Sequence, residues 1–294
     1  MVIKFTSVLI SLFFLSGLIG CQTPPPTKVI EQGDIQTGEK SLKEILKGEP
    51  TILDVRSAFE FNANHVPGAI NVRWEDFSQA DPRSRGLLQT DLFAVARRLS
   101  LIGIDPDTTV IVLGKGAEGV GEEGRVAWTL KVLGVKNVMT LNVSEIRGAY
   151  PREVPMTKNK PYWKPQVNAA LMVDTKAFKT VMKNGGDKAN NITMPVVLDV
   201  RTAQEFQLQA PNKKIFAKTE VKNIVWTEFF DKRGSPEAAV AQKLEQAGVA
   251  KGATIYVISN HGVRSGAVVF ALNSLGFRDV INVAGGYEQL GYIQ

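Results

Sequence analysis

The sequence predicts an α/β protein of two similar domains, each a parallel β-sheet flanked by helices. The stretch 51–56 recurs as 196–201, with Asp54 and Asp199 lying 145 residues apart. In each half, short apolar stretches alternate with helical ones, which is typical of α/β domains. These strands are apolar throughout, as expected when helices cover both faces of the sheet. A chain of 294 residues is also long enough for two domains.

The predicted elements follow the same order in both halves. Strands are expected at 51–56, 110–113 and 136–141 in the first half, with a helix at 125–133, and at 196–201, 254–258 and 279–283 in the second, with a helix at 264–275. The stretch 151–166 is rich in Pro and Lys and is typical of a linker. We therefore place the first domain at 37–155 and the second at 156–294.

The N-terminal segment has the pattern of an exported protein. Residues 1–20 carry Lys4 and then an apolar run, as in a secretory signal too short to span a membrane. The next residue is Cys21, and Leu18-Ile19-Gly20-Cys21 resembles the bacterial lipobox, whose cysteine is lipidated. The alternative is an ordinary signal peptide with a cysteine by chance. Residues 21–36 include three consecutive prolines and are expected to form an extended tether.

The resemblance to a lipobox implies a location and a first partner. The protein is expected to lie in the bacterial cell envelope, held on a membrane through lipidated Cys21. Gln22 follows the cysteine where an Asp would retain the protein at the inner membrane. The resemblance therefore implies an outer-membrane protein facing the periplasm, if the host has an outer membrane.

The composition argues against several functional classes. The net charge is +6, and basic residues do not alternate with aromatic ones, so nucleic acid is not an expected partner. Cys21 is the single cysteine of the sequence, which excludes an intramolecular disulfide. Since His65 and His261 are the two histidines, neither a metal site nor a cofactor is expected.

The first half carries a motif that resembles the opening signature of a rhodanese domain. It consists of Asp54-Val55-Arg56-Ser57 with Glu60, followed by His65-Val66-Pro67-Gly68-Ala69. The resemblance implies that Asp54 ends a strand, that Arg56 and Glu60 support the scaffold, and that His65 lies in a structural turn. The repeat gives the same structural roles to three residues of the second half, namely Asp199, Arg201 and Glu205.

The second half carries the more diagnostic motif. Residues 259–265 resemble the rhodanese active loop, Cys-x-x-Gly-x-Arg-Ser, and Gly285-Gly286 follows the next predicted strand. The resemblance covers 37–294 in the order of the two-domain thiosulfate sulfurtransferases, in which the first domain is inactive. At the position of the nucleophilic cysteine this sequence has Ser259, and the first half has Gly114.

This departure decides which chemistry is expected. Sulfane sulfur is carried on a cysteine thiolate, and a serine hydroxyl cannot hold a persulfide. Ser259 thus occupies the catalytic position but is expected to be inactive in sulfur transfer. A serine nucleophile would need a positioned base, and His261 in the same curved loop is expected to point away from Ser259.

The loop is nevertheless expected to bind a small anion. Its N–H groups lie at a helix N-terminus, where anions are favoured, and Arg264 is expected to add charge-assisted hydrogen bonds. The interval from Ser259 to Arg264 has the short length that resembles a sulfur-sized loop, so thiosulfate or sulfate fits better than phosphate. The predicted anion-binding residues are Ser259, Asn260, His261, Gly262, Val263, Arg264 and Ser265. The alternative is a relic loop without a ligand.

These observations predict a membrane-anchored member of the sulfurtransferase family that has lost sulfur transfer and binds a small anion or an envelope protein. Three alternatives stay open: residual sulfur transfer through an external thiol, hydrolysis by Ser259, and a purely structural envelope protein. A dinucleotide site at the Gly-x-Gly-x-x-Gly motif of 114–119 is not expected, because the acidic residue that should end the next strand is absent.

Overall fold

The structure is a computed structural model that describes residues 39–146, 159–186, 195–211, 213–250 and 252–291. The predicted signal segment, lipobox and tether lie outside these residues. Residues 37–294 form one compact unit. Among the helices of the described residues, none is both long enough and apolar enough to cross a bilayer.

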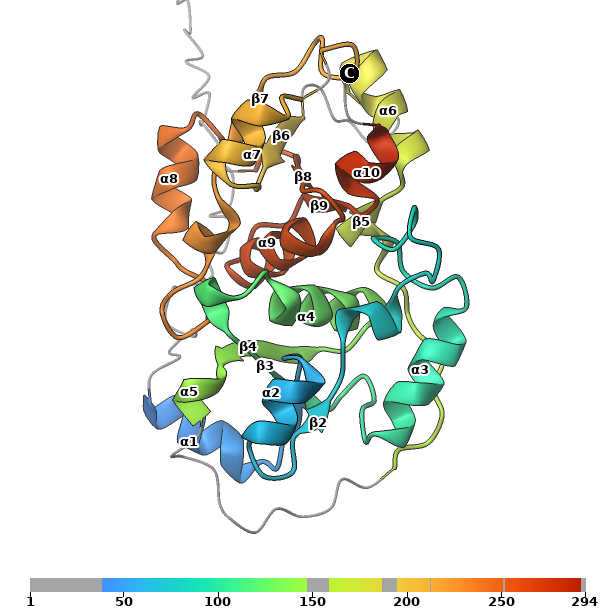
Figure 1. Cartoon of the computed structure of the whole chain (residues 1–294), viewed down its shortest axis with the longest axis vertical. Coiled ribbons are helices and arrows are strands. Elements are labelled where there is room, and N and C mark those ends of the chain that lie inside the picture. The colour runs from blue at the N-terminus through green and yellow to red at the C-terminus, as the bar shows by residue number, and fades with distance from the viewer. Residues whose placement is uncertain (1–38, 147–158, 187–194, 212, 251, 292–294) are drawn as a thin grey trace, which may run out of the picture. The chain divides into compact units, whose positions relative to one another are not determined.

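The first half contains a parallel sheet of four strands in the order β2-β1-β3-β4 (Figure 1). Its strands are β1 (Thr51–Asp54), β2 (Ile70–Asn71), β3 (Thr109–Gly114) and β4 (Asn137–Asn142). Its helices are α1 (Glu39–Lys47), α2 (Ala58–Ala63), α3 (Leu92–Leu101), α4 (Glu122–Leu133) and α5 (Val143–Ile146), with the 3-10 turns η2 (Trp74–Phe77) and η3 (Gly116–Glu118). The predicted parallel α/β fold is confirmed for this half.

The second half repeats this arrangement with one additional edge strand, in the order β5-β9-β8-β6-β7. Its strands are β5 (Met172–Val173), β6 (Val196–Asp199), β7 (Val221–Asn223), β8 (Ile255–Ile258) and β9 (Val280–Val283). Its helices are α6 (Thr175–Asn184), α7 (Ala203–Leu208), α8 (Val240–Gln246), α9 (Val263–Ser274) and α10 (Gly286–Leu290), with η4 (Ala169–Leu171) and η6 (Trp226–Phe229). The sequence repeat is therefore a repeat of the fold.

Each sheet is covered on both faces, as its apolar strands predict. Alternate residues of a strand point to opposite faces, so Ile52 packs toward α1 and α5, whereas Leu53 packs toward α4. In the second sheet, Val197 faces α6 and α10, and Leu198 faces α9. The inner faces of both sheets and helices α4 and α9 belong to one continuous apolar core.

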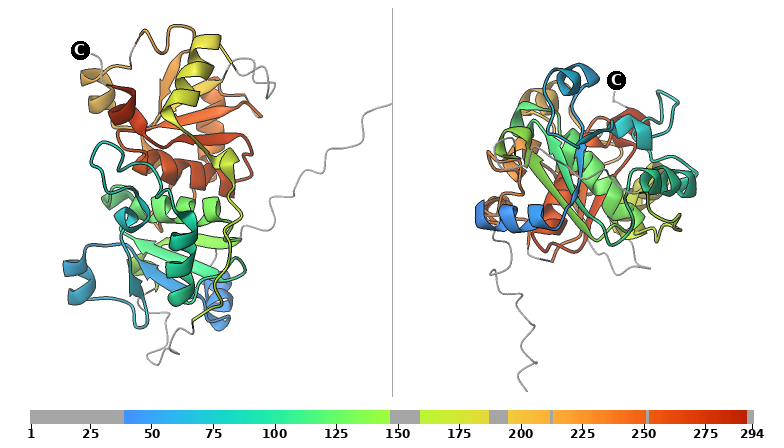
Figure 2. Two further views of the ribbon diagram at one scale, coloured as in Figure 1. Left: turned by 90° about the vertical axis from the view of Figure 1, so that its right-hand side faces the viewer. Right: turned by 90° about the horizontal axis from the view of Figure 1, so that it is seen from below.

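Helices α4 and α9 pack against each other between the two sheets (Figure 2). Both are buried on almost every side, which is why neither shows a polar stripe. They approach most closely at Gly124, where an added Cβ would lie 2.5 Å from the Cβ of Ala267. A glycine at this position therefore permits the packing that joins the two domains.

The chain between the sheets lies along the first domain. Lys160 N donates to Ser100 O, Trp163 Nε1 donates to Ile104 O at 2.9 Å, and Asn168 N donates to Val132 O. The predicted boundary at 156 assigned this stretch to the second domain, but its described part packs against α3, α4 and the turn before β3. Trp163 and the main-chain hydrogen bonds attach it there.

We predict that Gly124→Ala lowers the free energy of unfolding because its methyl group would overlap Ala267. The double variant Gly124→Ala/Ala267→Gly should recover part of this loss. Gly124→Ala should lower the free energy of unfolding by about 1 kcal/mol less in the Ala267→Gly background than in the wild type. Chemical unfolding of the four proteins measures this coupling, and purely additive effects would contradict the close approach of α4 and α9.

Candidate anion-binding loop

Both domains use the same aspartate–arginine pair where the first strand of the repeat ends. Arg56 donates to Asp54 from its main-chain N, its Nε and, at 2.6 Å, its Nη2, and the pair is almost fully buried. Arg201 makes the same contacts to Asp199, with Nη2 at 2.7 Å. Such buried pairs fix the direction of the chain as it leaves the strand. The contacts of these four residues are thus with one another and with the main chain beside them.

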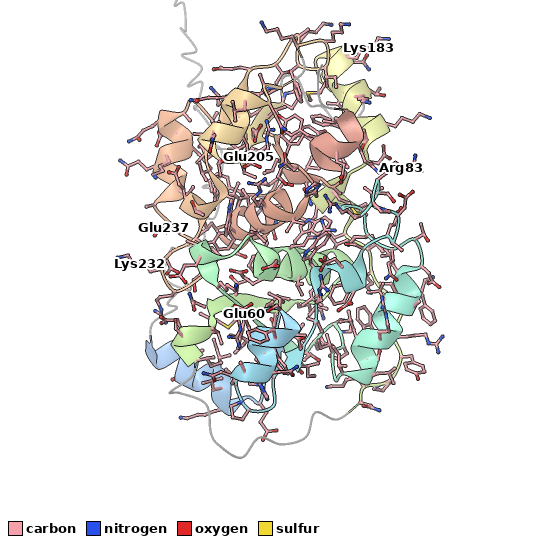
Figure 3. All side chains as sticks on the ribbon, viewed as in Figure 1. Glu60, Arg83, Lys183, Glu205, Lys232 and Glu237 are labelled. Atoms are coloured by element: carbon pink, nitrogen blue, oxygen red, sulfur yellow. The ribbon has the colours of Figure 1, made fainter. Side chains whose placement is uncertain are left out.

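Glu60 and Glu205 occupy equivalent places at the N-termini of α2 and α7 (Figure 3). Glu60 accepts from Ser57 and pairs with Lys115 at 2.8 Å. His65 follows α2, where its Nδ1 lies 2.9 Å from Phe61 O and its ring stacks on Phe61. These contacts place His65 in a turn, remote from the loop of the second domain.

Ser259 follows β8 directly and is buried, with 1% of its surface exposed. Its Oγ accepts from Ser265 N at 3.2 Å and lies 3.1 Å from Ser265 Oγ. Ser265 Oγ donates to Asn282 Oδ1 at 2.7 Å, and Asn282 Nδ2 donates to Gly262 O. Because the single hydroxyl proton of Ser265 is used on Asn282, Ser259 must donate its own proton to Ser265 Oγ.

The hydrogen bonds of Ser259 therefore contain no titratable group. A serine nucleophile requires a base that accepts its proton, and neither Ser265 nor Asn282 can act as one at neutral pH. His261 contacts Glu288 through Nδ1 at 2.9 Å and Arg85 Nη2 at 3.0 Å, and is not bonded to Ser259. The structure thus separates the one histidine of the loop from the hydroxyl.

The main-chain N–H groups of the loop are available to a ligand. Those of residues 260–264 donate to no acceptor in the described part of the chain. Gly262 adopts a left-handed conformation, with φ of +73°, and this turns the chain into α9. Successive free N–H groups at the start of a helix form a site that favours an anion.

Arg264 has a different partner from the one predicted. Its Nη1 and Nη2 donate to the two carboxylate oxygens of Glu205 at 2.6 and 2.7 Å. This pair holds the pKa of Glu205 down at about 2. In the described chain the guanidinium is bound by the carboxylate on α7, and Asn260 Nδ2 is bound there too, while the expected contact of Arg264 with an anion stays a prediction.

The first domain contributes a cation beside the loop. Arg125 on α4 is fully buried and donates to Gly262 O from Nη1 at 2.9 Å and to Gly86 O from Nη2 at 2.8 Å. None of the described carboxylates pairs with it, and its guanidinium lies over the ring of Trp128. Burial lowers the pKa of Arg125 to about 9, which still leaves it charged at neutral pH.

Residues 83–86 of the first domain also contact the loop and α10 of the second domain. A Cβ added to Gly86 would overlap His261 O and would lie 2.5 Å from Ala284 O. Arg85 pairs with Glu288, and Gln289 Nε2 donates to Arg83 O. The loop of the second domain is consequently shaped by residues of both domains.

The equivalent loop of the first domain is filled by a carboxyl group. Asp54 and Asp199 pair with Leu113 and Ile258 in the two sheets, so Gly114 is equivalent to Ser259. A side chain at Gly114 would overlap the carboxyl of Glu123, a residue with 2% of its surface exposed. The Oε2 atom of this carboxyl is buried without a hydrogen-bond partner in the described part of the chain. The Gly-x-Gly-x-x-Gly loop therefore has no space for a dinucleotide phosphate.

Several residues of the site were not predicted from the sequence. Asn282 could have been found, since it is a polar residue in an otherwise apolar predicted strand and must find buried partners. Arg125 and Gly86 could not, because their roles depend on the packing of one domain against the other, and the role of Glu123 depends on how α4 folds back against the end of β3.

The sequence match agrees with this geometry. The model of the rhodanese-like domain matches residues 39–144 and again residues 180–291. The chain belongs to the rhodanese-like domain family. It has the tandem arrangement of two such domains, and no curated protein matches the chain in sequence.

Solved structures share the fold of this rhodanese-like protein. SseA from Escherichia coli, described as a 3-mercaptopyruvate sulfotransferase, is 20% identical with a TM-score of 0.64, over 83% of this chain and 95% of that chain. Tum1 from Saccharomyces cerevisiae is 17% identical with a TM-score of 0.62, over 85% and 92%. An anaerobic ergothioneine biosynthesis enzyme from Chlorobium limicola is 15% identical with a TM-score of 0.64, over 85% and 66%. At these identities the likeness concerns the fold.

We predict that Glu123→Gln stabilises the protein in a pH-dependent manner. Burial raises the pKa of Glu123 to about 7 from an ordinary value of 4.5. The folded chain thus holds this proton more tightly than the unfolded chain, so the free energy of unfolding falls as pH rises between these two values. A glutamine does not ionise, so the stability of the variant does not fall for this reason. The difference in free energy of unfolding between Glu123→Gln and the wild type should be about 3 kcal/mol larger near pH 8 than near pH 4.

The matched control is Glu118→Gln, an exposed residue of the same loop. Unfolding by denaturant at a series of pH values measures both differences, and charge effects shared by all three proteins cancel. An advantage of Glu123→Gln that is the same at every pH would contradict the burial of a chargeable group.

Proposed function

We propose that this rhodanese-like protein is a lipid-anchored envelope protein that binds a small anion such as thiosulfate or sulfate and does not transfer sulfur. The observation that carries the proposal is Ser259, at the position of the family nucleophile, in a loop whose N–H groups are free. Cys21 is the only cysteine, and it belongs to the proposed anchor. A chain from residue 22 onward has no thiol that could carry sulfur between a donor and an acceptor.

The loop supports anion binding through its main chain. Free N–H groups at the start of α9 supply hydrogen bonds, and the helix adds a positive potential. The buried charge of Arg125 lies on the carbonyl side of Gly262 and has no described carboxylate to neutralise it. In a medium of low dielectric constant this charge favours an anion near the loop. The charges of Arg264 and Glu205 neutralise each other, so this pair supports the conformation of the loop and adds no net charge to it.

Hydrolysis by Ser259 is not favoured. The hydroxyl proton is directed to Ser265, and the only histidine of the loop is bonded to Glu288 and Arg85. In sulfur transfer through an external thiol, the protein could not carry the sulfur itself, because the chain has no cysteine after residue 21. Binding without turnover is therefore the function that this geometry supports best.

We predict that Ser259→Cys restores the first half of the family reaction. The thiolate would attack the outer sulfur of thiosulfate, the sulfur–sulfur bond of thiosulfate would break, and sulfite would leave with the electron pair. The loop N–H groups and the start of α9 favour the thiolate, so the new thiol should react near neutral pH. Mass spectrometry should find one added sulfur on the peptide that contains residue 259.

The wild type should show no such adduct and no transfer of sulfur to cyanide above background. The control is Ser144→Cys, which places a thiol on the exposed side of α5 and should take up little or no sulfur. A folded Ser259→Cys protein that remains unmodified would show that the loop has lost its anion-binding form. Turnover by the wild type at the level of a cysteine-bearing rhodanese would overturn the proposal.

We also predict that the mature protein begins at acylated Cys21. Mass spectrometry of the N-terminal peptide from the membrane fraction of an expressing bacterium should show this cysteine with its added acyl chains. Cys21→Ala should abolish the modified peptide without changing thermal unfolding, because residue 21 lies outside the compact unit 37–294. An unmodified cysteine, or a mature chain that starts elsewhere, would contradict the anchor.

A further inference from the structure

One face of the second domain carries nearly all of the excess positive charge. Helix α6 presents Lys176, Lys179 and Lys183, which are exposed and spaced so that they share one side of the helix. The segment 213–218 adds Lys213, Lys214 and Lys218, and Asp174 is the one acid in these two stretches. We call these six lysines the basic face. Counted together with Asp174, these lysines carry a net charge of +5, against +6 for the whole sequence.

The two stretches of the basic face are held together by the core beneath them. Phe178 of α6 packs against Phe216, with ring centroids 6.0 Å apart. Lys218 Nζ donates to Lys183 O at 3.1 Å, at the C-terminal end of α6, where a cation is favoured. The lysines are therefore positioned by the fold, since the apolar side of α6 is fixed by Phe178, Val181 and Met182.

Five lysines in the described part of the chain that lie outside the basic face have a carboxylate partner. Ion pairs are formed by Lys115, Lys136, Lys160, Lys222 and Lys243. In contrast, Lys176, Lys179, Lys183, Lys213 and Lys218 pair with no carboxylate that the structure describes. Asp174 is used to cap α6, where it accepts from Ala177 N. Five of the six lysines of the basic face therefore have no carboxylate partner in the described part of the chain.

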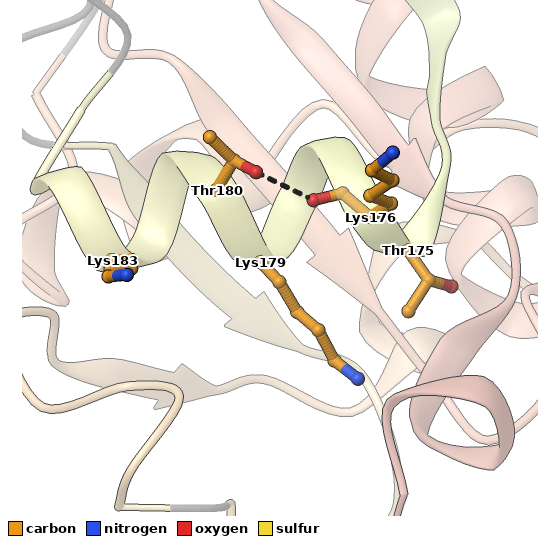
Figure 4. A pocket seen from close by; sticks show the side chains of 5 residues that line it. All are labelled: Thr175, Lys176, Lys179, Thr180 and Lys183. Carbon is orange, nitrogen blue, oxygen red and sulfur yellow. Dashed lines mark hydrogen bonds between the residues drawn. The ribbon is translucent and has the colours of Figure 1, made fainter.

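The shape and composition of the basic face indicate its partner. An open hollow along α6 is lined by Thr175, Lys176, Lys179, Thr180 and Lys183, with no buried donor that would enclose a small ligand (Figure 4). The face contains no arginine, and none of the large exposed apolar residues of the described chain lies on it. Protein interfaces depend on buried aromatic and arginine anchors, which are missing here.

We infer that the basic face binds the surface of a membrane that contains anionic phospholipids. Lysines are compact, strongly hydrated charges, and several of them near an anionic bilayer add up to firm but reversible attraction without insertion. The inference is independent of the anion-binding loop and of the N-terminal anchor. The face would orient the second domain against a lipid surface whether or not the chain is acylated.

The test uses residues 37–294, which form a compact unit with both sheets and all the cores described above. Removing the first 36 residues excludes any contribution of the anchor. The protein is sedimented with vesicles of phosphatidylcholine alone or of phosphatidylcholine mixed with phosphatidylglycerol. It should bind the mixed vesicles at low ionic strength and leave them as salt screens the charges.

The variant Lys176→Gln/Lys179→Gln/Lys183→Gln should lower the partition coefficient about one hundredfold, which is about fivefold for each lysine. The matched control, Lys47→Gln/Lys136→Gln/Lys164→Gln, removes the same charge from exposed positions outside the basic face and should bind like the wild type. Circular dichroism checks that both variants are folded.

Three outcomes would overturn the inference. They are equal binding to neutral vesicles, an equal loss in the control variant, and no binding to the anionic vesicles at low salt. A fourth arm replaces the vesicles with duplex DNA. Tighter binding to DNA than to anionic vesicles would assign the face to a different polyanion and would also overturn the lipid assignment.

Discussion

The close contact between α4 and α9 is the constraint on which the rest of the structure depends. It brings the inner faces of both sheets into one apolar core, and it requires a residue without a side chain at Gly124. It also determines where the start of each helix lies. Arg125 reaches Gly262 O because one turn of α4 lies beside the first turn of α9. The candidate site is therefore a product of this packing as much as of its own loop.

The repeat makes it possible to compare two equivalent loops, neither of which has a cysteine at its first position. In the second domain the nucleophile position keeps a hydroxyl, and the loop keeps its free N–H groups. In the first domain Gly114 leaves a space, and the carboxyl of Glu123 fills it. That carboxyl lies against the main chain of the loop at Gly114, and its Oε2 has no hydrogen-bond partner in the described part of the chain. In one loop a carboxyl of the protein lies against the main chain, and in the other the N–H groups of residues 260–264 have no acceptor in the described part of the chain.

Much of the fold could be predicted from the sequence because its signals are local. The apolar strands, the repeat that relates Asp54 to Asp199, and the glycine that begins α9 are all read from neighbouring residues. The additional strand β5 was missed because it has only two residues. The partner of Arg264 was missed for another reason. The loop motif shows a cation next to an anion site, but the carboxylate that binds this cation lies on α7, 59 residues earlier in the chain. Glu123 and Arg125 likewise depend on contacts between elements that no local pattern encodes.

The contact of Arg125 and Gly86 with the second loop has a consequence for how such a protein can evolve. A second domain produced alone would keep the donor Asn282 on Gly262 O but would lose Arg125, and it would lose the chain that contacts His261 and Ala284. A first domain produced alone would keep a buried cation whose carbonyl partner on Gly262 is missing. If the first half were exchanged for that of another tandem protein, the new half would need an arginine at the position of Arg125 and a glycine at the position of Gly86. The two halves of this gene are accordingly bound to change together, although each has the fold of an independent domain.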